Sequence, residues 1–158
     1  MAKQQTARME DYLEVIHLLT QEEGTAKVSG LAKRLGVKMP SVNAAVNRLA
    51  ERGLIDHSRY GDVRLTRSGE KIAAEVNRRH KVLARFFSLI LGIEEGTAQA
   101  DACKVEHVLS ANTMDRLASF VEFITEAPRK PEWLEHYFDY YEHGRRPAVC
   151  ESRPSCKQ

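Results

Sequence analysis

The chain opens with apolar residues at the spacing of an amphipathic helix. They predict a helix over about residues 8–22, whose apolar face consists of Tyr12, Val15, Ile16 and Leu19. Gly24 follows this pattern and marks the predicted end of the helix. Asp11 and Glu14 lie beside the apolar face, so the helix carries two carboxylates at its edge. His17 continues the same strip and is predicted to be a packing or surface residue.

Two short helical patterns separated by a glycine follow at residues 27–49. Ser29 is the predicted N-cap of the first, Gly36 permits a sharp turn, and Val37 is predicted to fill the space between the helices. Pro40 suits the first turn of the second helix, where no backbone N–H is needed. The apolar positions are Leu31, Ala32 and Leu35 in the first helix and Val42, Ala45, Val46 and Leu49 in the second.

The second of these helices presents small or short polar side chains outward, namely Ser41, Asn43, Ala44 and Asn47. A helix that lies in the major groove of DNA needs such side chains to reach base edges. The pattern therefore predicts a helix-turn-helix, with two small helices that have no role in DNA binding as the alternative. Gly53 is the predicted C-cap of the second helix.

Residues 54–66 predict two short strands around a turn near residues 60–62. Such a hairpin after a helix-turn-helix is a wing, from which Arg59 and Arg64 are expected to reach phosphates. The predicted DNA-binding residues are Lys38, Pro40, Ser41, Asn43, Ala44, Asn47, Arg48, Arg59 and Arg64.

Charge is distributed unevenly along the 158 residues. The net charge is +2, yet residues 27–79 hold 12 Lys and Arg against 5 Asp and Glu, while the remainder holds 12 against 17. The basic third is therefore a candidate for binding nucleic acid, and the acidic remainder is a candidate for binding cations. The first eight residues have no apolar signal region, and the longest apolar run, residues 86–93, is too short to span a bilayer. We expect a cytoplasmic protein with no membrane partner.

Helical patterns fill the second half of the chain. One runs from Thr66 or Ser68 as cap to Gly92, with His80 on its inward stripe. Residues 112–124 form another amphipathic pattern, and its large apolar face is either core or part of a dimer interface. An aromatic helix is predicted from Pro131 onward. Residues 144–158 have the composition of a disordered tail, in which Cys150 and Cys156 are expected to be free thiols, with a metal or redox role as the alternative.

Candidate metal ligands gather on three of these helices. Read as helix, residues 101–110 place Cys103, Glu106 and His107 on one face at i, i+3 and i+4. A core cysteine beside a surface Glu–His pair is the alternative for this triplet. Two acids of the first helix and the inward His80 supply further ligands, and this combination of acids, imidazoles and one thiol suits a divalent transition metal.

These segments resemble the metal-dependent repressors typified by the diphtheria toxin repressor and the manganese transport regulator. The resemblance covers about residues 9–124 and is carried by Met9-Glu10-Asp11-Tyr12-Leu13-Glu14, by the winged helix, by His80 after Arg78-Arg79, and by residues 103–110. It implies a homodimer that binds a palindromic double-stranded operator when its metal sites are filled. By position, the implied primary metal ligands are Asp11, Glu14, His80, Cys103, Glu106 and His107.

The ligand set combines features of two branches of that family. Asp11 and Glu14 match the manganese branch, as does the short chain, whereas Cys103 matches the iron branch. Ala84 and Gln99 occupy the positions of the iron branch's ancillary Glu and His, so that site is not expected in its usual form. One thiolate among hard or borderline ligands favours Fe²⁺ slightly over Mn²⁺, with one or two ions per subunit.

The sequence thus predicts a mainly α protein, with a winged helix-turn-helix DNA-binding domain over 1–72 and a helical metal-binding and dimerisation domain over 73–143. The predicted function is a metal-ion-activated transcriptional repressor of iron or manganese homeostasis genes. An ion shared by the ligands of the two domains is expected to tie them together. The alternatives are a winged-helix regulator that senses an organic ligand or an oxidant without metal, and a metalloenzyme, for which no catalytic motif is present.

Overall fold

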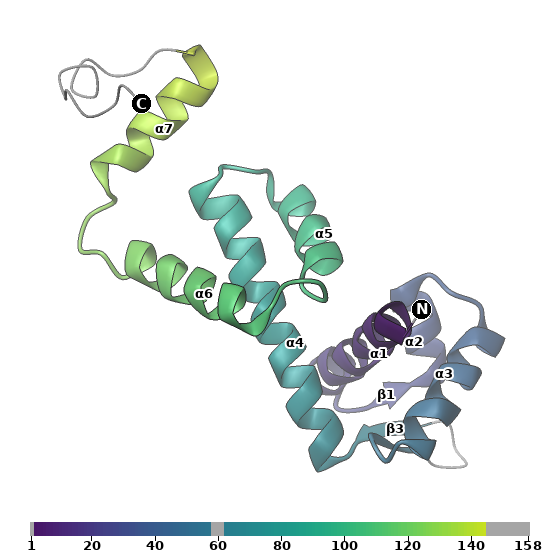
Figure 1. The fold of residues 1–158 in the computed structure, drawn as a ribbon. Helices are drawn as coiled ribbons and strands as arrows, with labels where there is room; N and C mark the ends of the chain where they lie inside the picture. Colours follow the sequence, from purple (N-terminus) through teal and green to yellow (C-terminus); the bar gives the residue numbers. More distant parts are fainter. Residues whose placement is uncertain (1, 58–61, 145–158) are drawn as a thin grey trace. The chain divides into compact units, whose positions relative to one another are not determined.

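The computed structural model describes the backbone of residues 2–57 and 62–144. Contacts divide the chain into two compact units, Met1–His80 and Lys81–Gln158, shown in Figure 1. Helices dominate both units, and the described strands form a single three-stranded sheet, which confirms the mainly α fold class. Within the described ranges, no helix combines the length and apolar character needed to cross a bilayer.

The first unit is built around α1 (Ala2–Glu23), which begins earlier than the sequence pattern predicts. Its predicted face is confirmed, since Val15, Ile16 and Leu19 are buried and Tyr12 packs against them. Residues from all other elements of the unit complete one apolar core around this face, including Leu31, Val42, Val46, Leu49, Ile55, Val63 and Ala73.

The predicted helix-turn-helix is present as α2 (Val28–Leu35) and α3 (Met39–Glu51). Gly36 has φ 64°, the left-handed conformation that the turn requires, and Pro40 lies in the first turn of α3. Two details of the prediction are wrong. α2 starts at Val28 because the strand before it ends at Lys27, so Ser29 is not its N-cap. Val37 is 38% exposed, because fully buried side chains of α2 and α3 already fill the core beneath the turn.

The wing is confirmed as β2 (Ile55–His57) and β3 (Asp62–Leu65), which pair antiparallel with Asp56 opposite Arg64. A third strand that the sequence did not predict, β1 (Ala26–Lys27), pairs with the other edge of β3, giving the order β1-β3-β2. The expected turn near residues 60–62 and the predicted DNA contact of Arg59 lie largely or wholly in residues 58–61, outside the described residues.

The start of α4 (Arg67–Arg85) is joined closely to the segment between α3 and the wing. Thr66 Oγ1 donates to the carbonyl oxygen of Gly53 (2.8 Å) and accepts from the backbone N–H of Gly69 (3.2 Å), which confirms Thr66 as a cap. A Cβ at Gly69 would stand 2.0 Å from the carbonyl oxygen of Leu54. Backbone therefore packs directly on backbone here, and only glycine fits.

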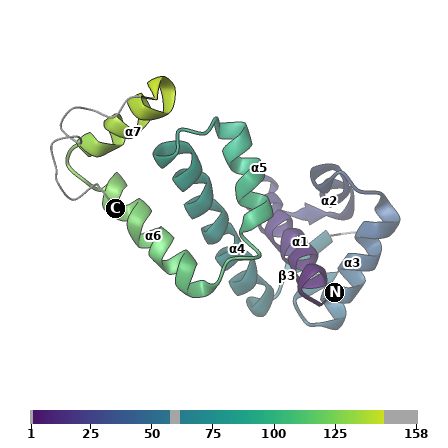
Figure 2. The same ribbon diagram turned by 45° about the horizontal axis from the view of Figure 1, so that its top comes forward.

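The second unit contains the C-terminal part of α4 and the helices that follow it. The long predicted helix continues as the π-helical segment η1 (Phe86–Ile90), against which α5 (Glu95–Val105) and α6 (Ala111–Thr125) both pack (Figure 2). The aromatic helix is confirmed as α7 (Glu132–His143). Two small apolar cores form, one around Leu83, Ala84, Ala102 and Met114 and one around Ile90, Val121, Ile124 and Leu134.

Candidate metal centre and DNA-binding surface

In the first unit the structure brings two predicted ligands together. Glu14 is a buried residue of α1, and one of its carboxylate oxygens lies within 4.8 Å of an imidazole nitrogen of half-buried His80, in the C-terminal half of the long helix α4. Asp11 lies one helical turn before Glu14 and is half-buried. A carboxylate on the buried face of an apolar helix costs free energy unless it is paired or binds a cation. The position of Glu14 therefore suits a ligand.

The second unit holds the other pair. The Glu106 side chain is fully buried, and its Oε1 lies 3.3 Å from Nε2 of His107, whose side chain is 7% exposed. The prediction of one continuous helix through these residues is wrong. α5 ends at Val105, Glu106 is its C-cap, and His107 lies in the turn before Ser110, which caps α6 by accepting from the N–H of Thr113.

Cys103 differs from its neighbours because it lies on the last turn of α5 and is exposed. The early end of the helix allows Glu106 and His107 to turn inward, whereas the thiol stays on a regular helical surface. Its role as a ligand stays a prediction. At the positions of the ancillary site, Ala84 is buried and has no donor atom in its side chain, and Gln99 is exposed with its amide 2.6 Å from Glu95.

The donor chemistry of these residues fits a divalent first-row metal. Carboxylate oxygens suit Mn²⁺, and imidazole nitrogens suit iron and later metals. His17, by contrast, is confirmed as a packing residue. Its Nδ1 lies 3.0 Å from Glu70 and its Nε2 2.8 Å from the amide of Gln21, so it links α1 to the start of α4.

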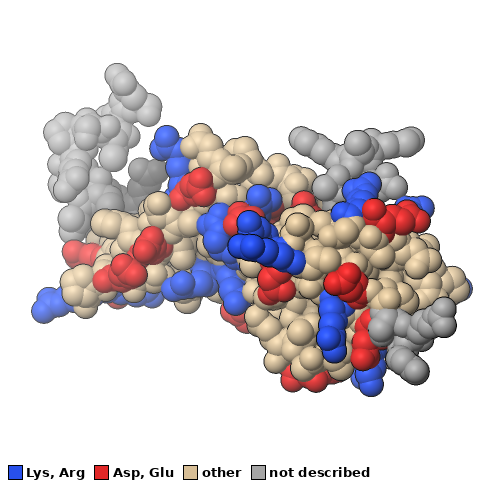
Figure 3. All heavy atoms as spheres, turned by 90° about the horizontal axis from the view of Figure 1, so that it is seen from below, with Lys and Arg blue, Asp and Glu red and all other residues tan. Residues whose placement is uncertain are grey.

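The predicted DNA-binding side chains that the structure describes are all exposed. Every one of them on α3 and at its N-cap is exposed, while the opposite face of α3 buries Val42, Val46 and Leu49. Arg64 is exposed on β3. Figure 3 shows that exposed Lys and Arg are interspersed with Asp and Glu over the face it draws, so charge alone does not locate a DNA-binding surface.

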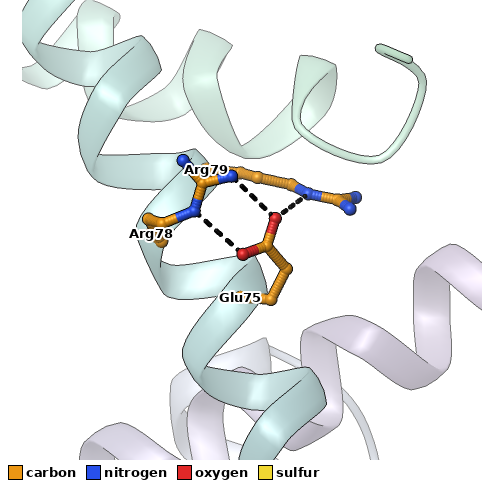
Figure 4. Close-up of polar contacts among 3 residues, drawn as sticks. All are labelled: Glu75, Arg78 and Arg79. Carbon is orange, nitrogen blue, oxygen red and sulfur yellow. Dashed lines mark hydrogen bonds and ion pairs between the residues drawn. The ribbon is translucent and has the colours of Figure 1, made fainter. Parts of the chain in front are cut away.

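Close to His80 in the sequence, α4 carries a network of three charged side chains (Figure 4). The carboxylate of Glu75 accepts two hydrogen bonds from Arg78 (both 2.9 Å) and one from Arg79 (3.0 Å). The bonds from Arg78, with a smaller contribution from Arg79, hold the pKa of Glu75 below its ordinary value. Two guanidinium groups share one carboxylate, so the network keeps a net positive charge.

Comparison with known proteins identifies both units. The model of the iron-dependent repressor N-terminal DNA-binding domain matches residues 4–63, and that of the iron-dependent repressor metal-binding and dimerisation domain matches residues 66–135. The chain is 35% identical over 139 residues to the HTH-type transcriptional regulator MntR of Geobacillus thermodenitrificans, covering 88% of this chain and 98% of that protein. It is 39% identical over 114 residues to the transcriptional regulator MntR of Escherichia coli O157:H7, covering 72% and 73% of the two chains.

Solved structures agree with these matches. A manganese-dependent transcriptional repressor in complex with manganese superposes with a TM-score of 0.66 at 34% identity, covering 78% of this chain and 55% of that one. The IdeR of T. acidophilum gives a TM-score of 0.65 at 27% identity, covering 77% and 55%. The chain thus spans about half the length of these two structures but nearly all of the Geobacillus regulator.

Proposed function

This chain belongs to the family of iron-dependent repressors, and from that premise we propose which residues carry its response to metal. It is a metal-activated, DNA-binding transcriptional repressor of metal homeostasis, and the regulating ion is Mn²⁺ or Fe²⁺. Its partners are double-stranded DNA and a second copy of the chain, which the dimerisation domain binds. The family consists of repressors rather than enzymes, so the metalloenzyme alternative is set aside.

The proposed ligands are the side chains of Asp11, Glu14, His80, Cys103, Glu106 and His107. The observation that supports this set is a closely spaced carboxylate–imidazole pair in each unit, Glu14 with His80 and Glu106 with His107. When bound, the ion supplies positive charge that compensates the buried carboxylates. One or two ions per subunit are proposed, and Cys103 favours Fe²⁺ slightly over Mn²⁺.

For DNA, Ser41, Asn43 and Ala44 of α3 are the proposed contacts to base edges, because their side chains are small and exposed. Arg48 and Arg64 are the proposed phosphate contacts. A homodimer presents two such surfaces, so the operator is proposed to be palindromic. Phe123, which is 72% exposed on α6, is a proposed contributor to the dimer interface. The cytoplasm is the proposed location, because the matched bacterial regulators act on DNA.

Metal controls the fraction of molecules that can bind the operator, and the ligands therefore control operator affinity without contacting DNA. Replacing Glu14 by Gln or His80 by Ala is expected to leave the fold and non-specific DNA binding intact. The same changes are expected to abolish the metal-dependent gain in operator affinity, on the order of 5–150-fold.

The measurement is an anaerobic titration of apoprotein with Mn²⁺ and with Fe²⁺, read out by operator binding. Glu122, which is exposed on α6, provides the control variant Glu122→Gln, which removes one carboxylate at a position outside the ligand set. A full metal response in both Glu14→Gln and His80→Ala would show that these residues are not ligands. Loss of the response in the control as well would show a general effect of charge.

A further inference from the structure

One face of α4 is almost entirely basic. Six of its solvent-exposed positions recur at alternating spacings of four and three residues, so they lie in one stripe along the helix, and the exposed Ser68 and Glu70 of its first turn lie beside that stripe. Five of the six positions are basic and the sixth is Ala74; the basic residues, which we call the α4 stripe, are Arg67, Lys71, Arg78, Lys81 and Arg85.

The positive charge of this stripe is largely uncompensated. Of the two acids of α4, Glu70 pairs with His17 of α1, and Glu75 pairs with one member of the stripe, Arg78, and with Arg79. Within residues 2–57 and 62–144, no ion pair is formed by the other members of the stripe, Arg67, Lys71, Lys81 and Arg85. Like charges four residues apart destabilise a helix by about 0.2–0.5 kcal/mol per pair, so the arrangement costs stability. A polyanionic partner would offset that cost.

The beginning of the stripe is fixed to the DNA-reading part of the first unit. The hydrogen bonds of Thr66 to Gly53 and Leu54 and the close packing of Gly69 on Leu54 hold the first turn of α4 against the C-terminal end of α3. Arg67 and Lys71 therefore lie in the part of α4 that these contacts hold in place, directly after the recognition helix and the wing in the chain.

We propose that the α4 stripe is a second, sequence-independent DNA-binding surface, which contacts the phosphate backbone beside the operator. The inference rests on the proposed function, because it requires that α3 has already docked on its site. From Arg67 to Arg85 the stripe is about 27 Å long at 1.5 Å per residue. Along B-DNA at 3.4 Å per base pair, this length corresponds to roughly eight base pairs. The shape and the charge of the stripe thus match one flank of a bound site.

Each phosphate neutralised releases counterions, so it adds about 0.9 to the slope of log affinity against log salt concentration. The side chains of the stripe carry no pattern that could read base edges in a groove. The expected contribution is therefore a gain in affinity that depends on salt and on the length of the flank, and that is independent of the flanking sequence.

The test uses the full, metal-loaded chain and a site selected by the wild-type protein from a random duplex library. Two duplexes are compared, one trimmed to the selected site and one with flanks of about ten base pairs, longer than the stripe. The variants are the pairs Arg67→Gln/Lys71→Gln and Lys81→Gln/Arg85→Gln. The matched control is Arg116→Gln/Arg129→Gln, which removes two positive charges at other exposed positions.

On the flanked duplex we expect the salt slope of each stripe pair to fall by about two units relative to wild type. On the trimmed duplex, all proteins should bind alike and should keep their metal dependence. Equal slopes for wild type and both stripe pairs on the flanked duplex would overturn the inference while leaving the repressor function in place.

Two other outcomes also contradict it. An equal fall for the Arg116/Arg129 control would mean that net charge is responsible, and not the stripe. If the two double variants of the stripe instead lose binding to phosphatidylglycerol vesicles while their DNA binding is unchanged, the stripe binds anionic lipid and not DNA. Failure of the metal-loaded wild type to bind any selected duplex would contradict the proposed function itself, and the inference would fall with it.

Discussion

At the scale of single residues, the most informative contrast lies between Cys103 and its two neighbours in the proposed ligand set. Glu106 and His107 are buried beyond the end of α5, whereas the thiol of Cys103 is exposed on the helix. A ligand set of oxygen and nitrogen atoms alone prefers harder metal ions than a ligand set that includes one thiolate sulfur. Cys103→Glu is therefore expected to shift the metal response of operator binding towards Mn²⁺ and away from softer ions.

The measurement is the ranking of Mn²⁺, Fe²⁺, Co²⁺ and Zn²⁺ in activating operator binding. Cys103→Ser serves as control, because it removes the thiol without adding a carboxylate. An identical ranking in the parent protein and in Cys103→Glu would show that the thiol is no ligand, and that its exposure reflects an ordinary helical surface position.

The shared carboxylate of Glu75 gives a second prediction at this scale. Its pKa is held below the ordinary value of 4.5, mainly by the hydrogen bonds from Arg78. The stability that it contributes is therefore present above that ordinary value and is lost as the pH falls through the lower folded-state pKa. Because the pair is partly exposed, Glu75→Gln should lower the free energy of unfolding at pH 7 by only about 0.2–1 kcal/mol.

Denaturant unfolding at a series of pH values measures this difference. The gap between the parent and Glu75→Gln should narrow below pH 4.5 and vanish once the carboxyl is protonated in both states. A gap that is constant down to strongly acidic pH would mean that Glu75 acts through packing instead of charge.

At the scale of elements, the junction between α3, the wing and α4 depends on the missing side chain of Gly69. In Gly69→Ala the added methyl would meet the carbonyl of Leu54, a backbone group that cannot rotate away. The junction must therefore open, at an expected cost of about 2–4 kcal/mol in the free energy of unfolding.

Gly96 provides a matched control, since it also lies in the first turn of a helix. A Cβ there would stand 3.1 Å from the carboxylate of Glu94, a side-chain end that needs to shift by only a few tenths of an ångström and can keep its cap hydrogen bonds to the N–H groups of Gly96 and Thr97, so Gly96→Ala should change stability by less than about 1 kcal/mol. Thermal unfolding of both variants tests the contrast. Equal destabilisation would refute the backbone contact as the cause.

The elements also show which features the sequence could predict. The helix-turn-helix and wing were predicted correctly, because Gly36, Pro40 and the apolar spacing specify local structure directly. The strand β1 was not predicted, because its two residues are too short for any periodicity and it exists only through pairing with β3. Val37 was placed wrongly for a similar reason, since burial at a turn depends on what other helices already fill.

The candidate metal site shows the same limit. The ligand types and their positions were visible in the sequence, but the end of α5 at Val105 was not. α6 begins after its N-cap Ser110, so the residues between Val105 and Ser110 form the turn between the two helices instead of continuing α5. The spacing of residues within one helix does not reveal where the next helix begins. The basic stripe of α4 was present in the sequence as well, yet its significance needed the exposure of each position and the pairing of Glu70 and Glu75.

At the scale of the whole molecule, binding of metal and of DNA must be coupled in both directions. If metal raises operator affinity by a given factor, operator DNA raises metal affinity by the same factor, typically about 5–150-fold. Calorimetric titration of Mn²⁺ into the protein, with and without operator, measures this directly. A duplex of scrambled sequence serves as control and should leave metal affinity nearly unchanged. Equal metal affinity with and without operator would mean that the ion has a structural role only.

The apolar cores of the two units are formed by separate parts of the chain, so the first unit can fold before the second has been synthesised. Every buried residue in the core of the first unit lies between Met9 and Ala73, whereas the proposed ligands extend to His107. At a synthesis rate of about 5–20 residues per second, the DNA-binding unit can fold roughly 2–7 seconds before the ligand set is complete. Each newly made chain therefore passes through a stage at which its DNA-binding unit can be folded while part of the proposed ligand set is still missing. Because that stage cannot end before synthesis has passed His107, the speed of the ribosome sets the shortest time for which a new chain is insensitive to metal.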